Sequence, residues 1–341
     1  MKPQSQPFVS VLTPVYNGEQ YLAECIESVL AQTYHNWEYC IVNNCSTDRT
    51  LEIAQSYASK DTRIRIHNNS KFVSSLQNHN VAFRLMSPAA KYCKLVDADD
   101  WLFQECIERM VALAEAHPTV AIVGAHRLRN DFMFWDGTPP YETSIMAGRE
   151  IGRHAFLDDP YVFGGSTSTL IGADEVRKRP TFYNEANFHC DIEACFDILR
   201  SRDFGFVHQV LTFTRVHVAA QSHFCKRFGT DYLGMLEHLT KYGRAYLSDE
   251  EFEQCFRQRW REYYAFLGAK IFDHSDKGLW TFHKKELARL GYRFRYGEVA
   301  KSAAARWLDL ALNPLKATQM IANKFMGDPE NAGIGTSEIA K

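Results

Sequence analysis

The sequence lacks the features that define three large classes of protein. Its nine cysteines among 341 residues lie singly and never in a Cys-x-x-Cys spacing, which indicates neither a zinc site nor a disulfide framework. No apolar run approaches the ~18 residues that a membrane-spanning helix needs, and the N-terminus has no long apolar segment of the kind found in signal peptides. We therefore expect reduced thiols in a cytoplasmic protein that does not span a membrane.

Net charge is also nearly absent. Lys and Arg total 39 against 41 Asp and Glu, so the overall charge gives no case for wrapping nucleic acid. The sum hides an asymmetry, because residues 1–224 carry 20 basic and 26 acidic side chains whereas residues 225–341 carry 19 and 15. An apolar fraction of 45% and this length predict a folded protein of about two domains.

Strand-like and helix-like segments alternate through the first part of the chain. The predicted strands cover residues 8–15, 37–42, 63–67, 92–96 and 120–124, and the segments between them have helical spacing. This alternation predicts an α/β fold with a doubly wound, mainly parallel sheet and helices on both faces. Such sheets bind ligands beyond the carboxyl ends of their strands, where Asn17, residues 43–48 and residues 97–100 are placed by the pattern.

Three carboxylates, Asp97, Asp99 and Asp100, follow the fourth predicted strand. Alternation along an extended segment places Asp97 and Asp99 on one side. Hard oxygen ligands of this kind suit Mg²⁺ or Mn²⁺, which usually also takes phosphate oxygens. The alternative is a capped turn, since acidic residues favour helix N-termini.

Four segments in succession resemble the conserved blocks of the family 2 glycosyltransferases. They are Val11 to Gly18, Ile26 to Thr33, Ile41 to Asp48 and Leu95 to Asp100, in matching order and spacing over about 100 residues. The resemblance implies the GT-A fold and transfer of a sugar from a nucleotide diphosphate donor, with inversion and a divalent metal, Mg²⁺ or Mn²⁺. The rest of the chain is expected to add a helical C-terminal extension.

The resemblance also assigns residues to the donor. It implies nucleotide binding by Thr13, Pro14, Val15, Tyr16, Asn17, Asn44, Asp97 and Ala98. Asn44 departs from the aspartate usual at the base-binding position; an amide still accepts a hydrogen bond, but without charge. A UDP-linked donor is expected, and plain turn chemistry is the alternative for residues 43 and 44.

The acceptor side and the metal follow from the later part of the resemblance. Asp191, at the predicted start of a helix, is the expected catalytic base, although Cys190 stands where an acid is usual and a helix cap is the alternative role. Asp99, Asp97 and His217 are the expected metal ligands, and Arg215 the expected phosphate partner. Acceptor contacts are assigned to Glu193 and to the glycine pair Gly164 and Gly165, which is also a common turn sequence.

The C-terminal region differs in composition from the rest. Residues 277–326 contain ten Lys or Arg against three acidic residues, interleaved with aromatic side chains. Such a mixture suits a membrane interface or an anionic, lipid-linked acceptor. The alternative is an ordinary helical subdomain, or a contact in a homo-oligomer, with a solvated basic face. We expect a GT-A domain at 1–224, a helical basic and aromatic extension at 225–326 and a disordered tail at 327–341.

These observations predict a metal-dependent inverting glycosyltransferase that acts on a glycan or lipid-linked acceptor hydroxyl, in the cytoplasm or at the inner face of the membrane. Two alternatives remain at this point. A nucleotidyltransferase would need a Gly-rich, basic triphosphate loop after the first strand, where this chain has Tyr16, Asn17 and Gly18. A non-catalytic sugar-nucleotide-binding or scaffold protein is compatible with the departures at Asn44 and Cys190.

Overall fold

The structure, a computed structural model, describes residues 6–130, 132–134, 143–159, 161–217, 221–271 and 277–313. The chain forms two compact units, residues 1–256 and 257–341. The tail expected at 327–341 lies outside the described residues. No helix in the described ranges is both long and apolar enough to cross a bilayer.

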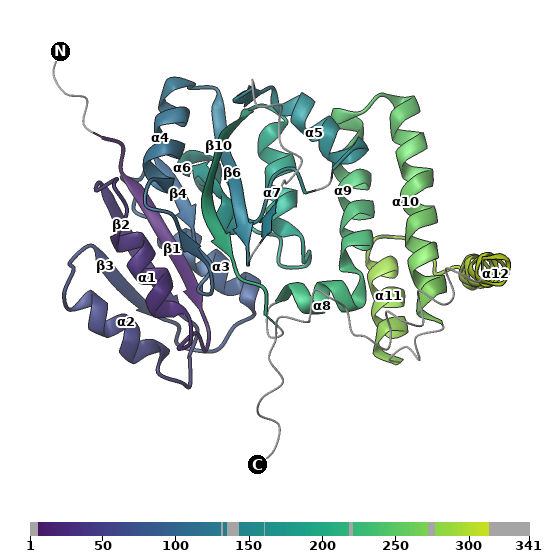
Figure 1. Ribbon diagram of the computed structural model, residues 1–341, viewed down its shortest axis with the longest axis horizontal. Helices are drawn as coiled ribbons and strands as arrows, with labels where there is room; N and C mark the ends of the chain where they lie inside the picture. Colours follow the sequence, from purple (N-terminus) through teal and green to yellow (C-terminus); the bar gives the residue numbers. More distant parts are fainter. Residues whose placement is uncertain are drawn as a thin grey trace. The chain divides into compact units, whose positions relative to one another are not determined.

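The first unit is built on a mixed sheet to which the described residues contribute ten strands (Figure 1). The strands in spatial order are β3 (Ile64–Asn68), β2 (Trp37–Asn43), β1 (Val9–Val15), β4 (Tyr92–Leu95), β9 (Thr169–Gly172), β6 (Val120–Arg129), β10 (Asp203–Thr214) and β5 (Trp101–Leu102), with β7 (Phe132–Phe134) beside β6 and β8 (Ile145–Met146) beside β10. The first four strands run parallel, as do β6 and β10, while β9 is antiparallel to both of its neighbours. The predicted mainly parallel α/β sheet is confirmed.

Helices cover both faces of this sheet because each central strand is apolar on both sides. Val9, Val11 and Val15 of β1 pack with helices α1 (Leu22–Leu30), α2 (Thr50–Ala58) and α4 (Cys106–Ala116). Leu12, which alternates with them, packs on the other face with α3 (Ser75–Arg84), α5 (Gly148–Leu157), α6 (Ala173–Arg177) and α7 (Cys190–Leu199). Because side chains alternate along β1, this one strand contributes to the apolar core on each face of the sheet.

Helices dominate the later part of the chain, as expected. They are α8 (Gln221–Phe228), α9 (Thr230–Tyr246), α10 (Asp249–Lys270), α11 (Lys277–Arg289) and α12 (Tyr296–Leu312). Within the first unit, α9 packs against α5 and α7. We keep the division at residue 224 as a proposal about where the sheet-based domain ends.

Candidate active site

Two neighbouring parallel strands bring the first predicted clusters to one edge of the sheet. Leu12 of β1 lies opposite Leu95, the last residue of β4, so the rest of β1 runs beside the segment that leads into Asp97. The Thr13 hydroxyl is completely buried and lies 2.8 Å from the Val96 carbonyl oxygen, to which it donates. Thr13 therefore fastens the end of β1 to the segment that leads into Asp97.

Asp97 is held from two sides by polar side chains. Its Oδ2 accepts a hydrogen bond from the Ser166 hydroxyl at 2.5 Å, and its Oδ1 lies 3.2 Å from Nε2 of His79. The glycine pair explains the first contact: Gly164 has a φ of 74°, which only glycine adopts without strain, and it turns the chain so that Ser166 faces Asp97. Gly164 and Gly165 thus shape the surroundings of Asp97.

His79 lies beside this carboxylate. Its Nδ1 lies 2.8 Å from the Ser75 carbonyl oxygen, which only accepts, so both ring nitrogens donate when the ring is charged. Burial alone would lower the pKa of His79, but the hydrogen bond and charge of Asp97 outweigh it and raise that pKa. In return, burial raises the pKa of Asp97 but the bonds from His79 and Ser166 lower it overall.

Asp99 faces the opposite way, toward the segment after β10. Its Oδ2 lies 2.8 Å from Nε2 of His217. Arg215 donates from its backbone N–H to Asp100 at 2.9 Å and from Nε to the Asp99 carbonyl at 3.0 Å, while its guanidinium reaches Glu24 at 2.5 Å. Arg215 therefore fixes the carboxylate turn itself, a contact that the expected phosphate role did not include.

The carboxylate turn concentrates negative charge. Burial and the charge of Asp97 raise the pKa of Asp99, and burial with the charges of Asp97 and Asp99 raises that of Asp100 well above its usual range. Because these carboxyl groups lie close together, the charge of one disfavours ionisation of the next. A bound cation would stabilise their charged forms. The turn is thus suited to a positively charged ligand.

The donor atoms here fit a divalent metal. Two adjacent ligands about 2.1 Å from an octahedral ion lie about 3.0 Å apart, close to the 2.8 Å between Asp99 Oδ2 and His217 Nε2. The described part of the chain holds no group of three or more His, Cys, Asp or Glu side chains arranged for a metal. A site with few protein ligands is the type that Mg²⁺ completes with substrate phosphates.

Asp191 approaches the same turn from the first turn of α7. Burial raises the pKa of its carboxyl, the neighbouring His189 lowers it, and the charge of Asp97 raises it again. Asp191 and Asp97, 94 positions apart in the chain, are therefore close enough for the charge of one to act on the other. The net raised pKa makes Asp191 a stronger base than an ordinary aspartate.

The residues expected to bind the nucleoside differ in how exposed they are. Tyr16 is 48% exposed and its ring meets that of Phe72 edge to face at 4.9 Å, while Asn17 accepts from the Thr47 N–H at 2.8 Å. Pro14 and Val15 are buried, and Ala98 is partly buried. Tyr16 and Asn17 are therefore the exposed members of this group.

Asn44 is buried and fully engaged inside the protein. Its Nδ2 donates to the Val73 carbonyl at 2.8 Å, and its Oδ1 accepts from the Val73 N–H and from Asn69, both at 3.0 Å. The side chain thus pairs with the backbone of the segment after β3. An aspartate could accept both bonds but could not donate to the Val73 carbonyl.

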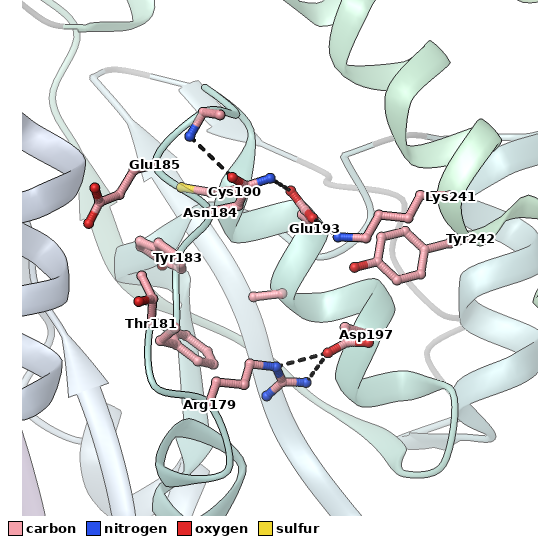
Figure 2. Close-up of a pocket in the computed structure, with 13 residues that line it drawn as sticks. Arg179, Thr181, Tyr183, Asn184, Glu185, Cys190, Glu193, Asp197, Lys241 and Tyr242 are labelled. Carbon is pink, nitrogen blue, oxygen red and sulfur yellow. Dashed lines mark hydrogen bonds and ion pairs between the residues drawn. The ribbon is translucent and has the colours of Figure 1, made fainter. Parts of the chain in front are cut away.

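Glu193 lines a cavity of about 470 Å³ beside α7 (Figure 2). Its Oε2 accepts from Asn187 at 2.8 Å and from Asn184 at 3.0 Å, and its Oε1 pairs with Lys241. A second ion pair, Arg179 with Asp197, lies in the same wall. Burial raises the pKa of Glu193, but Lys241 and the two amides lower it overall.

His79 and Ser166 are the site residues to which sequence reasoning gave no role of their own. The capping box at Ser74 and Gln77 fixes the start of α3 and so places His79. The contact of His79 with Asp97, however, depends on α3 packing beside β1, which is a tertiary feature. The Gly164–Gly165–Ser166 sequence was the available signal for the second residue.

Comparison with known proteins adds to this geometry. Residues 10–170 match the model of glycosyl transferase family 2. The chain carries a glycosyl transferase family 2 domain. Over 103 residues it is 36% identical to the glycosyltransferase GlyA of Streptococcus pneumoniae, a match that covers 30% of this chain and 14% of GlyA. The chain spans about half or less of the length of the curated relatives that it matches.

Solved structures confirm the GT-A fold of this glycosyltransferase domain. The S. aureus TarS fragment 1–349 in complex with UDP-GlcNAc superposes with a TM-score of 0.57 at 15% identity, covering 76% of this chain and 73% of that one. The mannosyltransferase PcManGT from Pyrobaculum calidifontis, in complex with GDP-Man and Mn²⁺, has a TM-score of 0.55 at 15% identity and covers 92% and 88%. The expected fold class is therefore confirmed, and the match to the expected family covers residues 10–170.

Proposed function

We propose that this protein transfers a sugar, with inversion, from a nucleotide diphosphate donor to an acceptor hydroxyl. One arrangement carries the proposal: Asp97 is close enough to both Asp99 and Asp191 for its charge to raise their pKa values, so a carboxyl group of raised pKa lies near the carboxylate turn. Charge stabilisation and proton removal are the two tasks of such a transfer.

In the proposed reaction the acceptor oxygen attacks the anomeric carbon while the bond from that carbon to the diphosphate oxygen breaks. Asp191 takes the acceptor proton, and its raised pKa suits it to that task. Asp97, held by His79 and Ser166, orients the donor. Exposed Tyr16 offers a ring to the base, and residues 13–17 with Asn44 form the floor of the nucleoside pocket.

A divalent metal, Mg²⁺ or Mn²⁺, is part of the proposal. Asp99 and His217 would hold it, and Asp97 lies behind them with both oxygens already engaged. When bound, the metal neutralises charge on the departing diphosphate. Arg215 keeps the backbone of Asp99 in place for this role.

The acceptor is proposed to approach along α7. Cys190 and Glu193, which flank Asp191, both line the cavity beside that helix, together with Tyr242 and Lys241 (Figure 2). Arg179 and Lys241 in the cavity wall are each paired with a carboxylate. The oxygens of these carboxylates keep lone pairs that can accept hydrogen bonds from hydroxyl groups. A glycan, free or lipid-linked, supplies such hydroxyls. A UDP-linked donor and a cytoplasmic setting, at the inner membrane face for a lipid-linked acceptor, complete the proposal.

A donor panel tests the proposal. UDP- and GDP-linked sugars are offered with Mn²⁺ and with short glycans or lipid-linked sugars as acceptors, and the released nucleoside diphosphate is measured. We expect turnover with one donor, loss of at least about 100-fold in Asp99→Asn, and unchanged turnover in the control Asp174→Asn, whose side chain is 89% exposed. Donor binding without turnover on any acceptor would favour the scaffold alternative, and equal turnover in Asp99→Asn would refute the assigned site.

A further inference from the structure

Helix α12 of the second unit exposes a continuous apolar stripe. Tyr296, Trp307, Leu308 and Leu312 are 64%, 63%, 62% and 71% exposed. Ala300, Ala304 and Ala311 are exposed as well. Residues 296, 300, 304, 308 and 312 recur every four positions, and residues 307 and 311 lie beside them, so all seven share one helical face. We call these seven residues the α12 stripe.

A different face of α12 holds the helix in its unit. Val299 and Ala303 are buried, and a Cβ on Gly268 of α10 would lie only 2.8 Å from the Ala303 backbone nitrogen. The close approach at Gly268 shows that α12 packs on α10 through Ala303 and its neighbour Ser302. The α12 stripe is therefore not the face that folding buries, and four large apolar side chains stay at the surface.

The exposed charge of α11, α12 and the segment between them is almost all positive. Within residues 278–313 the exposed basic side chains are Lys284, Lys285, Arg289, Arg293, Arg295, Lys301 and Arg306, whereas Asp309 is the exposed acidic one. Lys284 lies 5.1 Å from the ring centroid of Tyr296, at the N-terminal end of the stripe. An apolar face bordered by basic residues is the composition of helices that lie in a membrane interface.

We propose that the α12 stripe binds the surface of an anionic lipid membrane, with the helix axis in the plane of the interface. The apolar residues would enter the boundary between headgroups and acyl chains, and the basic residues would contact lipid phosphates. Pairing of the α12 stripes of two copies is less favourable, since both regions carry the same positive charge and like charges oppose association. A nucleic acid would match the charge and leave the apolar stripe uncovered. The proposal does not depend on the proposed transferase activity.

The test is sedimentation of the full chain with vesicles of phosphatidylcholine alone or mixed with phosphatidylglycerol. We expect binding to the anionic vesicles, at least about tenfold weaker binding to neutral ones, and a loss of at least about tenfold in Leu308→Gln/Leu312→Gln. Ala305→Gln, on the same helix outside the stripe, is the matched control, and Trp307→Phe keeps an apolar ring; both should bind like the wild type. Far-UV circular dichroism verifies that every variant keeps its helices.

Three results would overturn the proposal. The first is equal binding by the wild type and the Leu308→Gln/Leu312→Gln chain. The second is failure of the wild type to prefer anionic vesicles. The third is a concentration-dependent doubling of mass in light scattering that the double variant abolishes, because that result would assign the stripe to a contact between two copies.

Discussion

His238 gives the first unit a predictable sensitivity to acid. Its side chain is 1% exposed on α9, and its Nε2 lies 3.1 Å from Nδ2 of Asn187, an amide nitrogen that can only donate. The neutral ring accepts this bond, whereas a charged ring would turn a proton toward the amide. Burial and, to a lesser extent, the charge of His189 lower the pKa of His238 to about 3, and Glu193 partly opposes the shift.

The size of this pH effect follows from the difference between the pKa of His238 in the folded chain and its pKa in the unfolded chain. The unfolded chain binds this proton near pH 6.5 and the folded chain only near pH 3, so the unfolded state binds more protons and stability rises with pH. The contribution of His238 is complete above about pH 6.5 and falls by about 1.4 kcal/mol per pH unit below it. Between about pH 7.5 and about pH 5 the free energy of unfolding falls by about 2 kcal/mol. The result is the same for any pKa of His238 below about 4 in the folded chain.

Urea denaturation at the two pH values measures this loss, with His238→Gln as the test variant because glutamine can accept from Asn187 and does not titrate. We expect the variant to lose about 2 kcal/mol less than the wild type on acidification. His117→Gln, which changes an exposed histidine, should keep the wild-type loss. An identical pH dependence in His238→Gln and the wild type would refute the reasoning.

Three further predictions concern the site and its support. Ser166→Ala removes the 2.5 Å bond to Asp97; a hydrogen bond to a charged group contributes about 1.5–3 kcal/mol, so donor turnover should fall about 10- to 100-fold, whereas unchanged kcat/KM would speak against a role for Ser166. Gly234→Ala places a Cβ 2.5 Å from the His189 ring and should destabilise the protein by about 1–3 kcal/mol in thermal denaturation, unlike Gly297→Ala, whose Cβ would meet nothing within 4 Å. Asn44→Asp leaves the Val73 carbonyl without its donor and should lower the free energy of unfolding by about 1–3 kcal/mol; a more stable variant in urea would contradict this account of Asn44.

The fold could be predicted from the sequence because its signals are local. The alternation of Val9 and Val11 with Leu12 reports a strand buried on both faces, and the helical spacing after it reports α1. The antiparallel strand β9 was not predicted, since four residues after a glycine-rich turn carry little periodicity. Its place between β4 and β6 depends on tertiary pairing.

Sequence reasoning named candidate residues only within recognisable segments. Asp97 and Asp99 follow a strand and Asp191 lies in the first turn of a helix, so each was named as a candidate. His79 was not, since its function depends on how α3 packs. Asn44 shows the opposite case. Its position in the sequence matches a binding motif, but in the structure its three hydrogen bonds hold the segment after β3.

The role of Asp191 is the central claim, and its Asn variant tests it most directly. Donor affinity and transfer rate are measured for the wild type and Asp191→Asn with the same donor, acceptor and Mn²⁺. The account predicts donor affinity unchanged within about twofold and a transfer rate reduced by about 10² to 10⁴, the usual contribution of a general base. A variant that binds the donor and transfers sugar at the wild-type rate would contradict it.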